Sequence, residues 1–533
     1  MPVKHLTVVD SQLLSGLRDD LGQRRIGSGM ARLDRFWSDS GQFPASDPDG
    51  PGILCYVAQW VDAGWRDINV VQDGLASFPA GGRGRLRLVD FVHVLMAEGA
   101  LFVANEDVVR AQRNFDLVLA LKDELADPQL LSLAHFWKCR CHRKQGEYEA
   151  AMEHVGKGYL LACEAGMAPM AAAMRVAESW LLFQKGRSKE ALRLLGEAES
   201  VLSQTDDRIT LGNIESSYGR MYRREGRYDL SLRHFARAIE EYARRAPEHR
   251  NLARSLANMG YVERLVALQL RKRLDADAEQ KRKGDPALRR QYEKVIADAL
   301  SHLDRASAIY AFHHHYRGSG TAFVNRGFLH LDAGDLQRAE SEAIQAYTLG
   351  EEKKDFILMA RARLLQCLVA NTKLEEGIDD PAWVAKLALD YAGEAVDFAR
   401  HTENRRLLSR ALIWQGLTLC NTSPNAVDQA RELSEQAATL LKNEVQDHIW
   451  EDLQMLKSKV VKGGKMDSTL QAWSQGVVGE RSFNQLTEDF ADLIIPKVWE
   501  HEGRKVARVA KRLAVSPKKV RRVLGRLGLH GGL

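Results

Sequence analysis

Two short clusters of histidine and cysteine are the places where this sequence could bind a metal ion. They are the run His313-His314-His315 and the segment Cys139-x-Cys141-His142. Three consecutive residues of a helix point in different directions, so the histidines would not converge on one ion. Cys-x-Cys-His lacks the paired spacing of a structural zinc site. We therefore expect no metal site.

Sequence motifs for catalysis on phosphates or acyl groups are missing as well. Gly464-Lys465 is followed by Met466, and no Gly-x-x-x-x-Gly-Lys-Ser/Thr segment occurs in the chain. No serine nucleophile elbow stands out either. We expect that the protein is not an enzyme and needs no cofactor.

The C-terminal end of the chain carries a concentrated positive charge. The segment from Gly503 to Leu533 has ten lysines and arginines and no aspartate or glutamate, while the chain as a whole has a net charge of +5. The rest of the chain is therefore mildly acidic. A mildly acidic body with a strongly basic end is typical of a protein with a nucleic-acid-binding appendage.

The basic segment is patterned as helices rather than as a disordered tail. Apolar residues at helical spacing predict three helices. The first contains Phe483, Leu486, Phe490, Leu493 and Ile494; the second contains Val506, Val509, Ala510 and Leu513; the third, Pro517 to Leu527, would bury Val520, Leu524 and Leu527. Ser516 is a candidate N-cap, and Pro517 suits the first helical position. A tight turn between two short helices predicts a helix-turn-helix domain over residues 482–533.

This module resembles the DNA-binding domain of Fis-type proteins, which bacterial enhancer-binding activators share. The residues that match the family pattern are Val506, Ala510, Leu513, Val515, Val520, Leu524, Gly528 and Leu529. The resemblance and the outer face of the third helix together imply DNA contacts by Lys505, Arg508, Lys518, Lys519, Arg521, Arg522 and Arg526. Pro517 stands where Fis has a base-reading arginine, so phosphate contacts are better supplied than base readout.

The long body of the chain repeats about every forty residues. Turn glycines stand at Gly146, Gly186 and Gly226. A small residue recurs near the start of the following helix, at Ala111, Ala151, Ala191, Ser231, Ala299, Ala339, Ala388 and Ala430. Small residues at fixed helix positions let neighbouring helices approach closely. Two places break the pattern: a charged insertion, Leu270 to Lys294, and Asn371 to Trp383, which we interpret as an extended loop.

This repeat resembles the tetratricopeptide family, in which pairs of helices stack into a solenoid with a concave groove. The segment Tyr218 to Tyr242 matches best, although the period exceeds the family's usual thirty-four residues. The family's groove positions imply a peptide or protein ligand at Arg220, Arg223, Asn258, Asn325 and Arg326.

We therefore predict an all-α protein, a tetratricopeptide-like solenoid followed by a small helix-turn-helix domain. The predicted divisions are a partly flexible lead-in (1–52), the solenoid (53–462), a connector (463–481) and the Fis-type domain (482–533). The six scattered cysteines are typical of a reducing compartment, and no segment predicts a signal peptide or a membrane span. We expect a cytoplasmic protein.

The function that these features predict is that of a DNA-binding transcriptional regulator whose solenoid binds a peptide or protein partner. We expect it to act as a homodimer, because one short recognition helix reads few base pairs. Two alternatives remain open: a protein-interaction scaffold, and a subunit of a multi-protein stress or defence complex that uses the basic end for docking.

Overall fold

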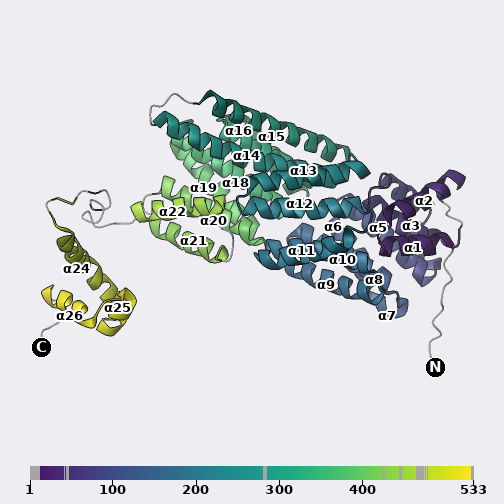
Figure 1. Ribbon diagram of the computed structural model, residues 1–533, viewed down its shortest axis with the longest axis horizontal. Coiled ribbons are helices and arrows are strands. Elements are labelled where there is room, and N and C mark those ends of the chain that lie inside the picture. Colours follow the sequence, from purple (N-terminus) through teal and green to yellow (C-terminus); the bar gives the residue numbers. More distant parts are fainter. Residues whose placement is uncertain are drawn as a thin grey trace. The chain divides into compact units, whose positions relative to one another are not determined.

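The computed structural model describes residues 12–40, 43, 47–279, 285–423, 426–442, 447–463, 473, 476, 478–479, 481–527 and 529. These residues form helices joined by short turns, with no strand among them, so the predicted all-α class is confirmed (Figure 1). The chain divides into two compact units, Met1–Lys457 (unit 1) and Ser458–Leu533 (unit 2).

Unit 1 begins with a small group of helices ahead of the repeats. Its elements are α1 (Gln12–Gly22), α2 (Ile26–Ser40), α3 (Gly50–Asp62), α4 (Asn69–Ala76) and the 3-10 helix η1 (Ala80–Arg85). Leu17, Leu33 and Trp60 are fully buried in one hydrophobic core with the first repeats. The region predicted as a partly flexible lead-in thus contains two helices that pack into this core.

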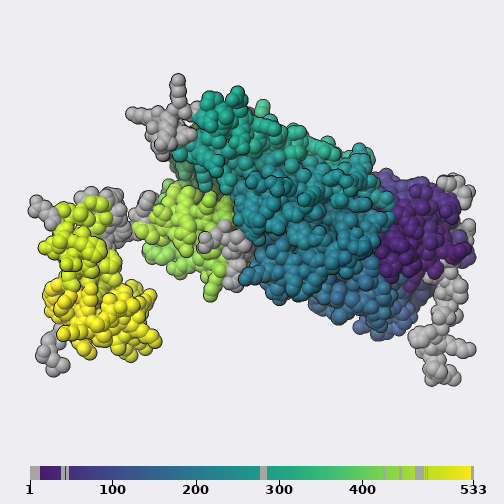
Figure 2. All heavy atoms as spheres, viewed as in Figure 1, coloured from purple at the N-terminus to yellow at the C-terminus, as the bar shows by residue number. Residues whose placement is uncertain are grey.

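Eight helix pairs follow, and in Figure 1 they run from α5 to α21. Their bounds are α5 (Leu88–Ala104) with α6 (Val108–Ala120), α8 (Pro128–Gln145) with α9 (Tyr148–Glu164), α10 (Ala168–Gln184) with α11 (Ser188–Leu202), α12 (Arg208–Arg224) with α13 (Tyr228–Arg245), α14 (Arg250–Glu279) with α15 (Pro286–Phe312), α16 (Tyr316–Asp332) with α17 (Leu336–Glu352), α18 (Phe356–Glu376) with α19 (Pro381–Arg400), and α20 (Arg405–Thr422) with α21 (Val427–Leu440). The one-turn helix α7 (Lys122–Leu125) interrupts the series, and α22 (His448–Gly463) ends it. In Figure 2 the atoms of these pairs form one closely packed body.

The predicted small residues lie where two helices of a pair touch. All eight, from Ala111 to Ala430, are fully buried. The Ser231 hydroxyl donates a hydrogen bond to the Gly219 carbonyl at 2.7 Å, and a Cβ on Gly219 would lie 2.9 Å from the Phe235 ring. Close approach of the backbones therefore explains why small residues recur.

The turn glycines also have the predicted role. Gly146, Gly186 and Gly226 have φ angles of +84°, +79° and +73°, in the left-handed region that favours glycine. Each lies between the two helices of one pair, so the forty-residue spacing marks successive pairs.

The two breaks in the repeat have different outcomes. The charged insertion falls on helices α14 and α15, which are unusually long, with 30 and 27 residues, and Asp285 caps α15. The extended loop predicted from Asn371 to Trp383 is wrong. Helix α18 continues to Glu376 because Leu374 packs against the buried residues of α18 and α19, which leaves a short turn, residues 377–380.

Unit 2 contains α24 (Phe483–His501), α25 (Val506–Leu513) and α26 (Pro517–Arg526). Ser516 caps α26, since its hydroxyl accepts a hydrogen bond from the Lys519 amide at 3.2 Å. The core consists of Ala491, Ile495, Val509, Ala510, Val520, Val523 and Leu524. Leu527, which we expected to be buried, is 41% exposed, because α26 ends one residue before it and Val523 completes the buried face.

Most of the predicted connector, residues 463–481, lies outside the described residues. Within the described ranges, no helix has the length and apolar character needed to cross a membrane.

Candidate functional site

The inner helices of the pairs surround a cavity of about 600 Å³ inside unit 1. Its lining is strongly cationic, with one lysine, two aspartates and twelve arginines among the described residues. The arginines are Arg24, Arg140, Arg143, Arg220, Arg223, Arg224, Arg250, Arg254, Arg317, Arg361, Arg406 and Arg410. They come from segments that are up to almost four hundred residues apart in the chain, so the superhelix curves around one space.

Direct contacts between distant repeats close this curve. The Glu403 amide, in the turn before α20, donates a hydrogen bond to the Gly146 carbonyl at 2.9 Å. The Glu403 carboxylate accepts a hydrogen bond at 2.6 Å from the amide of Glu149, in the first turn of α9. A third contact joins α16 to α8: Arg317 donates a hydrogen bond to the carbonyl oxygen of Lys144.

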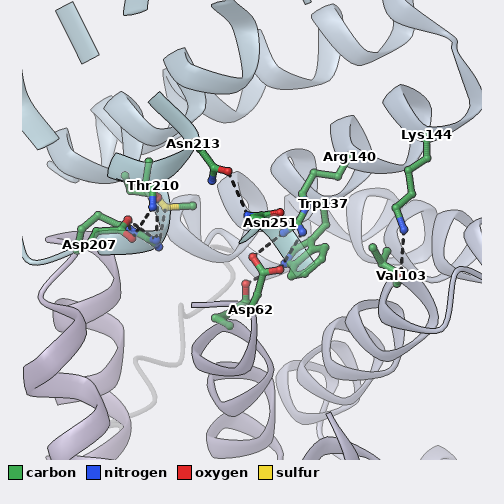
Figure 3. Close-up of polar contacts among 12 residues, drawn as sticks. Asp62, Val103, Trp137, Arg140, Lys144, Asp207, Thr210, Asn213 and Asn251 are labelled. Carbon is green, nitrogen blue, oxygen red and sulfur yellow. Dashed lines mark hydrogen bonds and ion pairs between the residues drawn. The ribbon is translucent and has the colours of Figure 1, made fainter. Parts of the chain in front are cut away.

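Some cations of the lining are neutralised by carboxylates. Arg140 makes a bidentate contact with Asp62, with N–O distances of 2.6 and 2.8 Å, as Figure 3 shows. Although burial favours the protonated acid, Arg140 holds the pKa of Asp62 well below its usual range. Arg24 pairs with Asp207 at 2.6 Å, Arg317 with Asp355, and Arg406 with Asp447. These ion pairs join different segments of unit 1, so their main role is to stabilise the fold.

A second group of cations faces the cavity without a carboxylate partner. Within the described part of the chain, no ion pair is found for Arg143, Arg220, Arg223, Arg254, Arg361 or Arg410. Neutral groups hold them instead: Arg254 donates to the Asn213 side-chain oxygen at 2.9 Å, and Arg223 donates to that of Asn258 at 3.1 Å. The Nε atoms of Arg220, Arg254 and Arg410 are buried and have no hydrogen-bond partner among the described residues.

Burial and the closeness of other cations lower the pKa values of several of these side chains. Burial, together with the charge of Arg254, lowers the pKa of Arg143 to about 10 and pushes that of Arg220 well below its ordinary value. Burial lowers the pKa of Lys144 to about 7, although Glu106 opposes the shift. Lys144 donates a hydrogen bond to the Val103 carbonyl at 3.0 Å (Figure 3). The cavity is therefore a region of high positive potential, suited to an anion.

Four of the five residues that the sequence suggested for partner binding line this cavity: Arg220, Arg223, Asn258 and Asn325. Arg326 does not. It pairs with Asp304 and Glu342, at 3.0 Å each, between α16 and its neighbours α15 and α17. Sequence reasoning missed Arg143, Arg254, Arg361 and Arg410, because only the closure of the superhelix brings them to one space.

The basic residues predicted to bind DNA lie on unit 2. Lys505 and Arg508 are at the start of α25, and the other five, Lys518, Lys519, Arg521, Arg522 and Arg526, are on α26. Two of them are engaged within the unit: Arg522 contacts Glu488 at 2.7 Å, and Arg526 contacts both Glu488 and Asp492. Lys518 and Arg521 are exposed and have no ion pair within the described residues. The freest cations therefore lie in the first half of α26 and on α25.

Among the described residues, no group of three or more His, Cys, Asp or Glu side chains is arranged to hold a metal ion. The His313 Nε2 atom donates a hydrogen bond to the Glu248 carbonyl at 2.5 Å, whereas His315 lines the cavity. The expectation that the three histidines lie on a helix is wrong: they form the turn between α15 and α16, with His314 in the left-handed conformation. His313 and His315 have different surroundings because of this turn.

Comparisons with known proteins establish the fold of unit 1. The sequence matches no protein-family model and no curated relative. The structure is similar to a Rap protein in complex with competence and sporulation factor, with a TM-score of 0.50 and 11% identity, over 78% of this chain and 99% of that chain. The apo quorum sensor NprR from B. thuringiensis gives a TM-score of 0.46 at 10% identity over 71% and 97%, and a human IFIT1 dimer with m7Gppp-AAAA gives 0.41 at 12% over 87% and 97%. The solenoid is thus a tetratricopeptide-like helical repeat.

Proposed function

We propose that this chain is a non-enzymatic, DNA-binding transcriptional regulator in which unit 1 binds an anionic segment of a peptide or protein. The observation that carries the proposal is the cavity lined by arginines without carboxylate partners. Buried charges are costly unless they are paired, so a protein that keeps several of them around one space gains most from an anionic ligand.

The fold supports this assignment without fixing it. Stacked helix pairs form concave surfaces that suit extended peptides or partner helices. The Rap protein with a similar fold was solved with competence and sporulation factor. For the present chain, the charge of the cavity selects acidic side chains or a C-terminal carboxylate, because arginine binds carboxylates in bidentate geometry.

Unit 2 supplies the DNA-binding part of the proposal. Helices α25 and α26, joined by a turn at Ala514 in the left-handed conformation, have the order and lengths of a helix-turn-helix. The Fis-type resemblance of the sequence assigns α26 as the recognition helix. Lys505, Arg508, Lys518 and Arg521 would bind phosphates, and the Arg522 and Arg526 side chains would have to leave Glu488 and Asp492 to do so.

Deletion of residues 481–533 tests this division of labour. The shortened chain should lose DNA binding in a mobility-shift assay over a salt series, yet keep the circular dichroism of a folded solenoid, because repeat stability comes from neighbouring repeats. Shifts of equal affinity from the shortened and full chains would show that unit 2 is not the DNA-binding part.

We further propose that unit 2 pairs with a second copy on DNA. Phe483 is 82% exposed and Phe490 is 48% exposed, on the helix that precedes the two short helices. The Fis-type resemblance implies pairing through helices in that position, and paired recognition helices would contact successive major grooves about 34 Å apart. Sedimentation should show a dimer for the full chain and a monomer for Phe483→Glu, with Phe312→Glu on unit 1, also exposed, as the control. A monomer both free and on DNA would contradict the pairing.

A further inference from the structure

The unpaired arginines of the cavity form one connected group. Arg220, on α12, is influenced electrostatically by Arg254 on α14, by Arg223 and by Arg143 on α8. Arg361, on α18, is influenced in the same way by Arg410 on α20 and by Arg223. Arg220 and Arg223 lie one helical turn apart on α12 and so connect the members of the group.

The partners of these arginines show which bonds a ligand could still accept. Arg220 donates to the Ser217 hydroxyl at 2.9 Å, and Arg361 donates to Thr321 and Asn325 at 3.2 and 3.3 Å. These acceptors are neutral, and each uses one corner of a guanidinium group that has five N–H donors. The Nε donors of Arg220, Arg254 and Arg410 have no acceptor among the described residues.

We infer that the cavity binds a compact ligand carrying two or more adjacent phosphoryl groups, which the six unpaired arginines contact together. This inference rests on the proposed function, whose anionic ligand it narrows. A phosphoryl group offers oxygens in three directions and up to two charges at neutral pH. It can therefore contact guanidinium groups from three helices at once, with one more oxygen and up to twice the charge of a carboxylate.

The concentration of positive charge in the cavity favours a dense anion over a chain of carboxylates. Six cations without carboxylate partners face about 600 Å³. Acidic residues of a peptide bring one charge each together with a backbone and methylene groups that also need room. A short polyphosphate therefore supplies more negative charge in less volume.

The probe for this inference is inorganic tripolyphosphate, added to the full chain and followed by thermal melting and calorimetry. We expect binding that raises the melting temperature, because a ligand specific for the folded state stabilises it. Arg220→Gln and Arg254→Gln should each weaken the affinity at least tenfold. Arg326→Gln is the matched control, since Arg326 is a partly buried arginine on an inner helix that does not line the cavity. It should change the affinity less than twofold.

A second readout separates ligand binding from a structural role. Removing an unpaired cation from a crowded cluster relieves repulsion, so the ligand-free Arg220→Gln and Arg254→Gln proteins should melt at the same or a higher temperature than the parent chain. A merely structural arginine would show the opposite, a lower melting temperature in both variants. That result, together with unchanged tripolyphosphate affinity, would overturn the inference.

Further ligands distinguish the source of the phosphoryl groups. A nucleoside triphosphate that binds more tightly than tripolyphosphate would indicate a nucleotide, and a doubly phosphorylated serine peptide that does so would indicate a modified peptide; both support phosphoryl recognition. Hexa-aspartate binding as tightly as tripolyphosphate would overturn the inference while leaving the proposed function intact. Loss of DNA shifts, measured separately, would count against the proposed function and not against the cavity.

Discussion

The arginines that line the cavity fall into two electrostatic classes, those paired with a carboxylate and those without one. Arg140 meets Asp62 in a bidentate pair, whereas Arg220 and Arg254 meet only neutral acceptors and each other. A buried ion pair is a poor stabiliser but is costly to break, and an unpaired buried charge is costlier still. The folded chain therefore keeps an unfavourable concentration of positive charge that a bound anion would relieve.

Residue-scale chemistry in unit 2 makes a prediction about DNA affinity. Glu488 holds Arg522 and Arg526, and both of these arginines were expected to contact phosphates. Glu488→Gln removes the competing charge, so DNA binding should tighten severalfold, with a steeper dependence of affinity on salt. Mobility shifts at several salt concentrations measure both quantities.

Glu500→Gln serves as the control for this change, because Glu500 is an exposed glutamate of the same helix. It should tighten binding less, since it removes the same charge at a site away from α26's two arginines. Equal effects of the two variants would attribute the gain to net charge alone.

At the scale of elements, the helix pairs depend on glycines with two different structural roles. Gly226 supplies a left-handed turn between α12 and α13, while Gly219 lets those helices touch. Gly219 on α12 faces the fully buried Phe235 on α13, so the aromatic ring occupies the space that a side chain on Gly219 would need. Such contacts explain the sequence repeat without any reference to ligand binding.

Gly219→Ala and Gly156→Ala make a matched test of this packing. A Cβ at Gly219 would lie 2.9 Å from the Phe235 ring, so we expect a loss of about 1–3 kcal/mol in unfolding free energy. Gly156, within α9, has no atom within 4 Å of such a Cβ, so alanine there should stabilise by about 0.5–1 kcal/mol. Chemical denaturation measures both, and a neutral Gly219→Ala would show that the pair packs more loosely than described.

At the scale of the whole of unit 1, contacts between distant helix pairs bring the lining of the cavity around one space. Residues about 250 positions apart, Glu149 and Glu403, share a hydrogen bond of 2.6 Å. The Glu149 amide is in the first turn of α9, where amides have no acceptor within their own helix. Its protection from solvent exchange therefore reports on the closing contact.

We predict that Glu403→Ala speeds hydrogen exchange of the Glu149 amide by an order of magnitude or more and costs about 1 kcal/mol of stability. Glu403→Gln keeps a side-chain oxygen that can accept the bond and should retain most of the protection. Exchange measured by NMR or mass spectrometry gives the answer. An unchanged rate in Glu403→Ala would mean that the superhelix is held closed elsewhere, as by Arg317 on the Lys144 carbonyl.

The sequence alone determined the parts of this protein that depend on local pattern. Turn glycines such as Gly226 and small residues such as Ala191 predicted the helix pairs. The steric requirements of one pair involve only about forty consecutive residues, so they are visible in the sequence. The three helices of unit 2 were predictable for the same reason, apart from the exposure of Leu527. The loop assigned to Asn371–Trp383 failed because the packing of Leu374 against another helix outweighed local composition.

Only the tertiary structure decided which side chains share the cavity. Arg220 and Arg326 look alike in the sequence, as arginines on inner helices, yet one faces the cavity and the other pairs with Asp304 and Glu342. Arg143 and Arg361 are more than two hundred residues apart and line one space because small rotations between successive helix pairs add up to a curved superhelix. The total curvature depends on every interface between helix pairs along the solenoid, so no single segment of the sequence determines it.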